Sequence, residues 1–390
     1  MSWSVEEHAA HIAEHVALRW RPEFVTLDDA LGRVTASAVL SPVDLPLFRN
    51  SQMDGFAVRA ADVASSPTAL PIAGHLPAGP AQPAPLAPGT AVRIMTGAVV
   101  PEGADAIVPV EDTATRGDTV TVTRGRTVGE FVRERGSDLR AGSLLVPEGT
   151  RLESRHLAAL AAAGLTGLEV RSRVRVAIIT TGSEIVQPGT EPLPGQLFDS
   201  NATALTAAVR AVGALPVRRE HVDDDAVFML AALDSAVDAD LILTSGGISA
   251  GDHEVVRDVL EPRGARVGHV AMQPGGPQAT ALFQGVPVVC FPGNPVSTQL
   301  SFEVFLAPLL RELAGLPQAV RRPRVLASGL RSPAGKRQFL RARVTADDRV
   351  EVSGASSHLV AGLAASDVLV VVPEEVTELA AGDTVETWQL

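Results

Sequence analysis

The chain of 390 residues has one cysteine, no excess of positive charge and no long apolar run. Cys290 has no partner for an internal disulfide, so a disulfide-stapled fold is excluded. We expect Cys290 to be a small buried residue of a strand rather than a nucleophile. No apolar run reaches the ~20 residues that a membrane helix requires. The first residues carry Glu6 and Glu7 and lack the apolar core of a secretory signal, so the expected location is the cytoplasm.

Positive charge is scarce along the whole chain. Lys and Arg number 33 against 45 Asp and Glu, which gives a formal net charge of -12. No nucleic-acid surface is expected, because binding to a phosphate backbone needs clustered cations. An acidic protein that handles anions must concentrate its few cations at the site. The length exceeds one core and predicts two to four domains, and 46% hydrophobic with 20% charged residues is typical of a soluble globular protein.

The first predicted element is a helix with three histidines. Apolar residues near helical spacing predict an amphipathic helix over residues 4–18. His8, His11 and His15 fall along one flank of this helix. We expect that flank to be solvated; a metal site is the alternative, but no carboxylate or cysteine constellation completes it.

The following segments predict another helix, a β domain and a third helix. Residues 26–34 begin with a capping-box-like sequence and predict a short helix. Residues 50–150 are dominated by valine, threonine, glycine and proline, which predicts a small inserted β domain. Residues 154–164 return to helical spacing, with Ser154 as the expected N-cap.

From residue 173 to about residue 316, a pattern of strand, glycine turn and helix repeats. Such a repeat predicts a mainly parallel sheet with helices on both faces and a ligand crevice at the carboxyl ends of the strands. We expect the glycine turns to converge there. Residues 320–390 lack helical spacing and predict a terminal β domain, with its clearest strand at 368–372. The predicted strands of the repeat cover residues 174–181, 241–245 and 286–291, and the predicted helices cover residues 202–212, 252–260 and 296–313.

The turn after the strand at residues 241–245 contains Gly246 and Gly247 and lies between a strand and a helix. Adjacent glycines and a helix N-terminus form a good phosphate cradle, to which Ser249 adds a hydroxyl. Asp252 and Glu254 have the opposite sign, so they would serve a phosphate only through Mg²⁺ or would cap the helix. A tight turn with an N-cap explains the segment equally well. No Gly-Lys-Ser/Thr follows, so this is not a Walker A motif.

Two further turns carry the same ambiguity. Glu184 follows Gly182 at a strand end, where we expect its carboxylate either to bind the amide edge of a ligand or to cap a turn. The turn at residues 291–297 holds two prolines, which indicates a rigid ligand wall or only a stiff connection. In the terminal domain, the guanidinium of Arg341 is a natural partner for a tetrahedral dianion, although alone it is only part of a basic strand.

The inserted domain contains two polar residues that each precede a glycine. Asp54 stands before Gly55 and Thr96 stands before Gly97, and both follow apolar residues. Asp54 is suited to bind a metal ion or orient a polar ligand, and Thr96 to donate to an oxyanion. No nucleophile elbow of the Gly-x-Ser-x-Gly type lies at a strand end, so a serine or cysteine hydrolase is poorly supported.

Together these segments resemble the MoeA / gephyrin E-domain family, the molybdopterin molybdenumtransferases. The resemblance spans essentially the whole chain. It implies a multidomain α/β fold: a central three-layer α/β molybdopterin-binding domain, an inserted β domain, an elongated helical and β N-terminal domain and a C-terminal β-barrel-like domain. The implied boundaries are 1–48 plus 136–168 for the N-terminal (dimerisation) domain, 49–135, 169–318 and 319–390. The segments that carry the resemblance are NSQMDGFA, RIMTGAVVPEGADAIVPVE, RGSDLRAG, TTGSEI, PGQLFDSN, DLILTSGGISAGD, VAMQPGGP, FPGNPVS and FLR.

The resemblance implies an activity and a set of residues. The activity is Mg²⁺-dependent insertion of molybdate into adenylylated molybdopterin with release of AMP, in a homodimer of L-shaped subunits. A molybdopterin adenylyltransferase is a further implied partner. Asp138 and Asp223 match acidic positions whose role stays open. The implied catalytic residues are Asp54, Thr96, Glu184, Ser249 and Arg341, the substrate-binding residues are Gly246, Gly247, Ser249, Pro292, Gly293, Asn294, Pro295, Ser357 and His269, and the metal ligands are Asp252 and Glu254.

One departure from the family pattern affects the expected function. Many members have Lys-Pro-Gly-Lys where this chain has Gln273, Pro274, Gly275 and Gly276. The resemblance implies that those lysines help to hold the oxyanion, so His269 or Arg337 would have to compensate for them. The alternative function is a molybdopterin or cofactor carrier or scaffold with reduced insertion activity.

Overall fold

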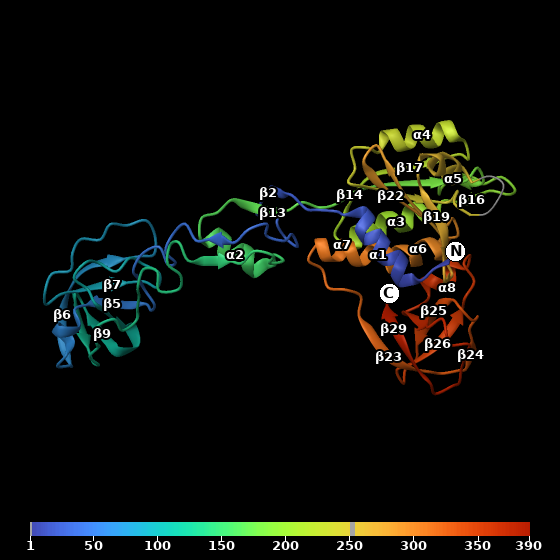
Figure 1. Ribbon diagram of the computed structural model, residues 1–390. Helices are drawn as coiled ribbons and strands as arrows, with labels where there is room; N and C mark the ends of the chain where they lie inside the picture. Colours follow the sequence, from blue (N-terminus) through green and yellow to red (C-terminus); the bar gives the residue numbers. More distant parts are fainter. Residues whose placement is uncertain (1, 250–253) are drawn as a thin grey trace. The chain divides into compact units, whose positions relative to one another are not determined.

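The computed structural model describes residues 2–249 and 254–390 (Figure 1). The chain divides into two compact units. Unit 1 comprises Met1–Pro22 and Arg171–Leu390, and unit 2 comprises Glu23–Val170. Among the described residues, no helix combines the length and apolar character needed to span a bilayer.

A central mixed sheet organises unit 1. Strands β17, β14, β18 and β22 lie side by side and run parallel, whereas β21 is antiparallel to both of its neighbours. The inner strands β14 and β18 are apolar over consecutive residues because both of their faces are buried. The predicted parallel core is confirmed. In spatial order the strands are β1 (Ser2–Trp3), β19 (Arg266–Val270), β21 (Pro277–Phe283), β22 (Val286–Phe291), β18 (Leu241–Ser245), β14 (Arg175–Thr181) and β17 (Leu215–Val222).

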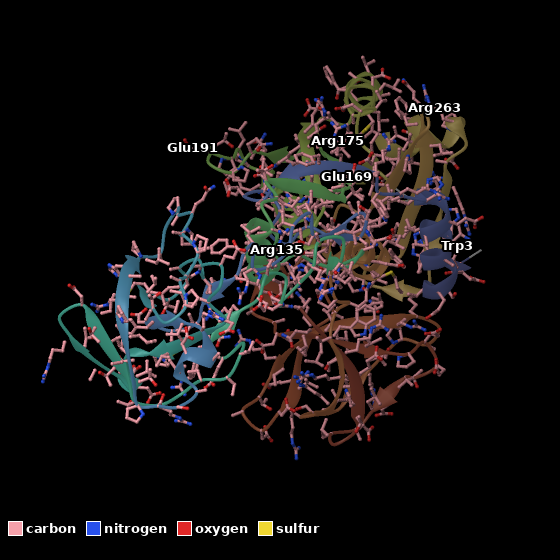
Figure 2. The ribbon with its side chains drawn as sticks, turned by 90° about the vertical axis from the view of Figure 1, so that its left-hand side faces the viewer. Trp3, Arg135, Glu169, Arg175, Glu191 and Arg263 are labelled. Carbon is pink, nitrogen blue, oxygen red and sulfur yellow. The ribbon has the colours of Figure 1, made fainter. Side chains whose placement is uncertain are left out.

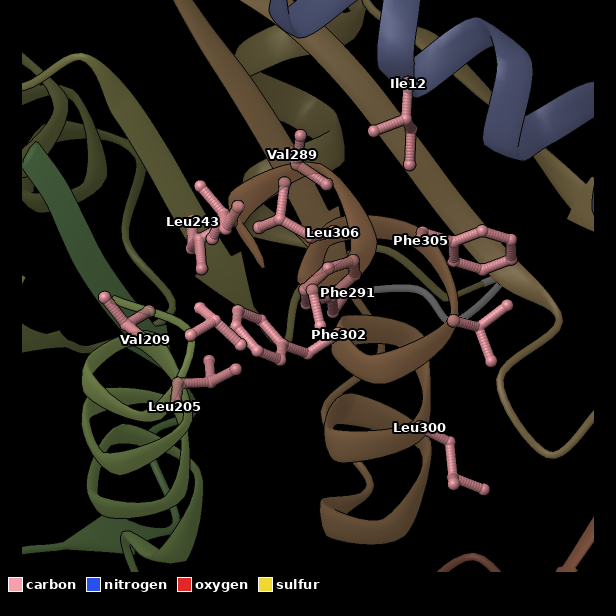
Figure 3. Close-up of a cluster of buried hydrophobic side chains, with 14 of the residues drawn as sticks. Ile12, Leu205, Val209, Leu243, Val289, Phe291, Leu300, Phe302, Phe305 and Leu306 are labelled. Carbon is pink, nitrogen blue, oxygen red and sulfur yellow. The ribbon is translucent and has the colours of Figure 1, made fainter. Parts of the chain in front are cut away.

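Helices cover both faces of this sheet, and successive strand residues point to opposite faces. Val176 and Ile178 pack with α1, α3, α6 and α7, while Ala177 and Ile179 pack with α4 and α5. Figure 3 shows the first face, where Phe291 lies among side chains of the helices. The helices are α1 (Val5–Val16), α3 (Ser200–Ala211), α4 (Ala226–Ser235), α5 (Val255–Leu260), α6 (Pro295–Ser301) and α7 (Ala307–Leu313), and a π-helical segment, Phe302–Leu306, joins α6 to α7.

Cys290 lies in β22 and points to the α4–α5 face, fully buried. Burial raises the pKa of its thiol to about 12, because the thiolate would lose its hydration. The prediction of a small buried strand residue is confirmed.

Helix α1 shows that the expected solvated histidine flank is wrong. His8 is 1% exposed, stacks on Trp3 and meets the edge of Phe305. His11 Nε2 hydrogen-bonds to Thr280 Oγ1 (2.8 Å), and His15 Nε2 donates to a backbone oxygen of β21 (2.8 Å).

The cause of this burial is a long-range strand pairing. The residues before α1 pair in parallel with β19, which lays the helix against the sheet. Figure 2 labels Trp3 beside the start of this helix. The first 22 residues therefore belong to unit 1, whereas the predicted boundaries placed them in the N-terminal domain.

The C-terminal segment of unit 1 forms a closed β-barrel, as predicted. The barrel closes because β25 pairs with both β26 and β27. Strand β20 extends from the central region and pairs with the start of β25. The elements are β20 (Met272–Gln273), β23 (Arg321–Leu326), β25 (Arg337–Val344), β26 (Arg349–Gly354), α8 (Val360–Ala364), β27 (Val368–Val372) and β29 (Thr384–Gln389), with the small ladder of β24 (Leu330–Arg331) with β28 (Glu378–Leu379). Another small ladder, β15 (Ile185–Val186) with β16 (Leu197–Phe198), lies between β14 and α3 along the chain.

Unit 2 contains the predicted β domain. Alternate residues of β5 serve two clusters: Phe56 and Val58 pack in one and Ala57 in the other. The main sheet has the order β8 (Ala106–Pro109), β5 (Gly55–Val58), β7 (Ala91–Ile94), β6 (Thr68–Leu76), β10 (Thr119–Val122) and β9 (Thr113–Arg116), and the rest of the unit contains α2 (Ser154–Ala162) and the ladders β2 (Pro22–Thr26) with β13 (Gly167–Arg171), β3 (Val39–Leu40) with β12 (Leu144–Val146), and β4 (Asn50–Ser51) with β11 (Val132–Arg133).

Two local predictions in unit 2 are wrong. Residues 26–34 form a turn instead of a helix: Thr26 Oγ1 donates to Asp29 Oδ2 (3.0 Å), but the next backbone groups pair with residues 150–152. The capping-like sequence closes one turn, and long-range pairing then takes the place of helical hydrogen bonds. The N-cap of α2 is Glu153, one residue before the predicted Ser154.

The buried His8 makes the stability of unit 1 depend on pH. Burial, and then the charges of His11 and Arg266, lower the pKa of His8 to about 3. Below about pH 6.5 the unfolded chain binds a proton that the folded chain refuses, so stability is lost as the pH falls. The free energy of unfolding should fall by up to about 1.4 kcal/mol per pH unit from this group.

We expect His8→Phe to make this slope shallower between about pH 7 and pH 5, while an exposed-histidine control, His75→Gln, leaves it unchanged. All three tryptophans lie in unit 1, so their fluorescence during urea titration reports its unfolding. An unchanged slope in His8→Phe would contradict a neutral buried imidazole.

The Cys290 thiol should resist alkylation in the folded protein, because it is buried and protonated at neutral pH. Reaction with a chromogenic disulfide should be slow in buffer and should reach one thiol per chain in urea. Fast labelling of native protein would contradict this burial.

Candidate functional site

The three strand-end loops meet at one edge of the central sheet, as the sequence predicts. A cavity of about 780 Å³ there is lined by residues that follow β14, β18 and β22. The loops touch closely: a Cβ on Gly293 would lie 3.3 Å from Gly246 Cα, and one on Gly246 would lie 2.7 Å from the oxygen of Thr181. Gly246 also has a φ of +101°, which favours glycine.

The predicted phosphate cradle is only partly available. The N–H of Gly246 donates to the oxygen of Phe291 (3.1 Å), so it already has a partner. Gly247 and Ser249 line the cavity and remain at its surface. The cradle would therefore rely on the later part of the loop.

A buried hydrogen-bond network fixes the rigid turn. Asn201 Nδ2 donates to Ser245 Oγ (3.0 Å) and to the oxygen of Gly293 (2.6 Å). Ser245 Oγ also hydrogen-bonds to Thr298 Oγ1 (3.0 Å), whose hydroxyl donates to the oxygen of Pro292. The turn is thus held from both sides. Its predicted members divide between two walls: Pro295 faces this cavity, Pro292 faces an adjoining one, and Gly293 and Asn294 line both.

Two carboxylates in the cavity serve the fold. Asp199 accepts from Thr180 Oγ1 (2.8 Å) and from the first turn of α3, which it caps. Asp224 accepts from Thr181 Oγ1 (2.6 Å) and from the N–H of Ser183 (3.0 Å). Asp224 is therefore the acidic residue at the cavity, whereas its neighbour, the predicted Asp223, does not line it.

Two other carboxylates, Glu184 and Glu254, line the same cavity. Asp252, the other predicted metal ligand, lies outside the described residues. Within the described chain, no group of three or more metal-ligating side chains is assembled. Mg²⁺ commonly uses one or two carboxylates and completes its shell with phosphate oxygens and water, so the carboxylates present are compatible with it.

A second cavity of about 440 Å³ adjoins the first through Ser249, Gly293, Asn294 and His358. Its other walls come from the loop at residues 273–276, the loop after β26 and the start of β25. Two predicted residues, His269 and Ser357, line it, and so does Lys336. None of its described lining residues is acidic.

Arg341 is buried and does not line either cavity, although its charge predicted a residue that faces an anion. It is 1% exposed, and its guanidinium donates to the backbone oxygens of Leu359 and Gly354 (3.2 Å for the latter). Burial lowers the pKa of this guanidinium, because the charge loses hydration. Arg341 lines neither cavity and instead braces the loop that carries Ser357.

Arg337 is not available as a compensating cation. Its guanidinium pairs with Glu6 and with Glu374, the latter at 3.0 Å. These two carboxylates neutralise the charge away from the second cavity, which Arg337 does not line.

Asp54 and Thr96 lie together in unit 2. The N–H and the hydroxyl of Thr96 both donate to Asp54 Oδ1, each at 2.7 Å. These two bonds, the N–H first, lower the pKa of the exposed Asp54 carboxyl. Gly55 has no room for a side chain, since a Cβ would lie 2.0 Å from the oxygen of Val108. Asp138 lies exposed in the same unit.

Sequence reasoning missed Asn201, Asp224 and Lys336. Asn201 stands in the segment PGQLFDSN, but its contacts are with residues 44 and 92 positions away. Lys336 stands beside Arg337, and its side-chain type gave no indication that it reaches a cavity. A signal was available only in the rarity of lysine, which occurs once in the chain.

Comparisons with known proteins agree along the whole chain. Residues 3–164 match the description MoeA N-terminal region (domain I and II), residues 177–312 a probable molybdopterin binding domain, and residues 323–390 the MoeA C-terminal region (domain IV). The chain is 45% identical to molybdopterin molybdenumtransferase 2 of Mycobacterium tuberculosis over 403 residues, covering 99% of each chain.

A second relative is the molybdopterin molybdenumtransferase of Nostoc, 38% identical over 304 residues, with 75% of this chain and 70% of the relative covered. Among solved structures, a molybdopterin biosynthesis MoeA protein of Pyrococcus horikoshii superposes with a TM-score of 0.84 at 31% identity, covering 100% of this chain and 99% of that one. The chain therefore belongs to the MoeA family of enzymes, the molybdopterin molybdenumtransferases.

Proposed function

We propose that the protein inserts molybdenum from molybdate into adenylylated molybdopterin and releases AMP, forming molybdenum cofactor. The observation that carries this proposal is the pair of adjoining cavities, one with glycine loops and carboxylates and the other with hydroxyls, imidazoles and one lysine. In this reaction molybdenum–sulfur bonds form at the dithiolene of the pterin, the molybdate gives up oxygen, and the phosphoanhydride is cleaved to release AMP. An organic phosphoanhydride and a tetrahedral oxyanion must therefore lie side by side, which suits two adjoining compartments. The names of the relatives support a transfer of molybdenum to molybdopterin.

The first cavity suits the organic substrate. The Glu184 carboxylate accepts hydrogen bonds, which matches the N–H groups on the edge of a pterin. The glycine loop lets phosphates approach the backbone closely, and the Ser249 hydroxyl is placed to donate to them. The rigid turn would hold the anhydride in one orientation, and orientation is a large part of rate acceleration in group transfer.

Mg²⁺ is assigned to the same cavity. Glu254 would hold it, with Asp252 as the second proposed ligand, and the substrate phosphates would complete its shell. When bound, the ion supplies positive charge that stabilises the phosphates as the anhydride breaks.

Molybdate, as a substrate, is assigned to the second cavity. Ser357 and His269 line it and supply hydrogen-bond donors. Arg341 would act as a positioning residue, because it holds the Ser357 loop through backbone oxygens. Its role is then to keep the donors in place rather than to touch the oxyanion.

Asp54 and Thr96 are proposed to act from the partner subunit of a homodimer. Their two hydrogen bonds keep the Asp54 carboxyl ionised and aimed, which suits a residue that must meet a ligand domain of another chain. The proposed setting is the cytoplasm, with a molybdopterin adenylyltransferase as the source of substrate.

The purified protein should release AMP from adenylylated molybdopterin only when molybdate and Mg²⁺ are present. Glu184→Gln should lower the rate roughly ten- to hundredfold, since one charge-assisted contact is lost. The matched control is Glu191→Gln, an exposed carboxylate on the next loop, between β15 and β16, which does not line the cavity (Figure 2). AMP release without molybdate, or wild-type rates in Glu184→Gln, would refute the assignment.

The carrier function stays a second candidate because the 273–276 loop provides no cation. Under that function the wild type binds the pterin without AMP release, and restored lysines create turnover. The structure shows that one of these lysines would require the side chain of His269 to move. A Cβ on residue 276 would lie 2.6 Å from His269 Nε2, so Gly276 and His269 are matched in size.

Gly276→Lys alone should therefore displace His269 and lower the melting temperature, while Gly276→Lys with His269→Gly should recover it. Gln273→Lys carries no such clash and is the control for added charge. Equal melting temperatures for Gly276→Lys and Gln273→Lys would show that the two sites are not coupled. The same variants are also assayed for AMP release. Release by the wild type indicates the transferase, whereas release only after lysines are restored indicates the carrier.

A further inference from the structure

Lys336 is the single lysine among the 390 residues, and it lies on the wall of the second cavity. The loop at residues 273–276 and the loop at residues 355–358 form other parts of the same wall. The chain otherwise uses arginine for its cations, so the one ammonium group is found beside a concave, polar surface.

The charge of this cavity differs from that of the rest of the protein. Its described lining residues include Lys336, two histidines and four serines but no carboxylate. The first cavity, by contrast, is lined by Glu184, Asp199, Asp224 and Glu254. In a chain of net charge -12, a concave surface that excludes carboxylates and gathers donors is suited to an anion.

The ammonium group of Lys336 is uncommitted. Within the described part of the chain it forms no ion pair and no hydrogen bond, while the adjacent Arg337 is paired with Glu6 and Glu374. Its charge therefore remains available to a ligand. The neighbouring Arg337 pairs with Glu6 and Glu374, so these two carboxylates are occupied by another cation.

The two residues that directly follow Lys336 are held by hydrogen bonds to the segment at residues 271–273. The N–H of Arg337 donates to the oxygen of Ala271 (2.9 Å), and Gln338 Nε2 donates to Gln273 Oε1 (2.8 Å). These bonds, in the parallel pairing of β20 with β25, fix residue 336 next to the 273–276 loop. The lysine thus stands where that loop itself offers only amide and glycine groups.

We propose that Lys336 is the anion-binding residue of the second cavity and supplies its main fixed positive charge to a tetrahedral dianion. The identification of the dianion as molybdate rests on the proposed function. The argument from charge is independent of that function. A compact ammonium with three donors suits an oxyanion that also receives hydroxyl groups from Ser356 and Ser357.

The test is equilibrium dialysis of the full-length protein against molybdate, with metal analysis of bound molybdenum. Lys336→Gln should weaken binding by roughly tenfold or more, and Lys336→Arg should recover most of the affinity. The control is Arg331→Gln, which removes an exposed cation of the barrel outside the cavity. The difference between Lys336→Gln and wild type should shrink in high salt, because an exposed charge is screened.

A second readout uses the uniqueness of the lysine. An amine-reactive acetylating reagent should modify Lys336 more slowly when molybdate is present. Peptide mass spectrometry measures the rate of this modification. Wild-type affinity in Lys336→Gln, or no protection from acetylation, would overturn the proposal even if AMP release is normal. Weaker dianion binding in Lys336→Gln with no AMP release from the wild type would support it while the transferase function fails.

Discussion

The parallel register of β14, β18 and β22 is the constraint on which the rest of the site depends. Thr180 pairs with Ser245, and Ser245 pairs with Phe291, so the three strands end level with one another. Each strand is followed by a turn that contains a glycine. The turns approach so closely that a side chain at Gly246 or Gly293 would meet the backbone of a neighbouring turn. Both cavities are built on this edge. A one-residue slip would exchange the two buried faces and separate the loops.

Much of the fold could be predicted because its signals are local. The segments Leu241–Ser245 and Val368–Val372 are short apolar runs between turn residues, and both are strands with the predicted bounds. The burial of His8 could not be predicted, because it requires Ser2 and Trp3 to pair with a strand more than 260 residues away. The predicted helix at residues 26–34 fails for the same reason, since its backbone groups pair with residues 150–152.

The candidate site divides in a similar way. The loops holding Glu184 and Gly246 were predicted to meet because parallel strands bring their carboxyl ends to one edge, and they do. Residue type did not reveal which cations face a ligand. Arg341 donates to backbone oxygens and Arg337 pairs with carboxylates, while Lys336 is exposed at the cavity. These outcomes depend on partners from distant segments, which no spacing rule encodes. The roles of all these residues stay proposals.

The charges of the two cavities explain why they need different cations. Carboxylates line the first cavity, so a phosphate there would meet like charges unless a mobile cation lies between them. The described lining of the second cavity has no carboxylate, so a dianion needs no added metal and a fixed ammonium is sufficient. Ser249 and Asn294 belong to both walls, so two anions would be held only a short distance apart. Under the proposed function, each anion would have to be neutralised separately before the two could be brought together, so the proposed Mg²⁺ and Lys336 would have distinct tasks.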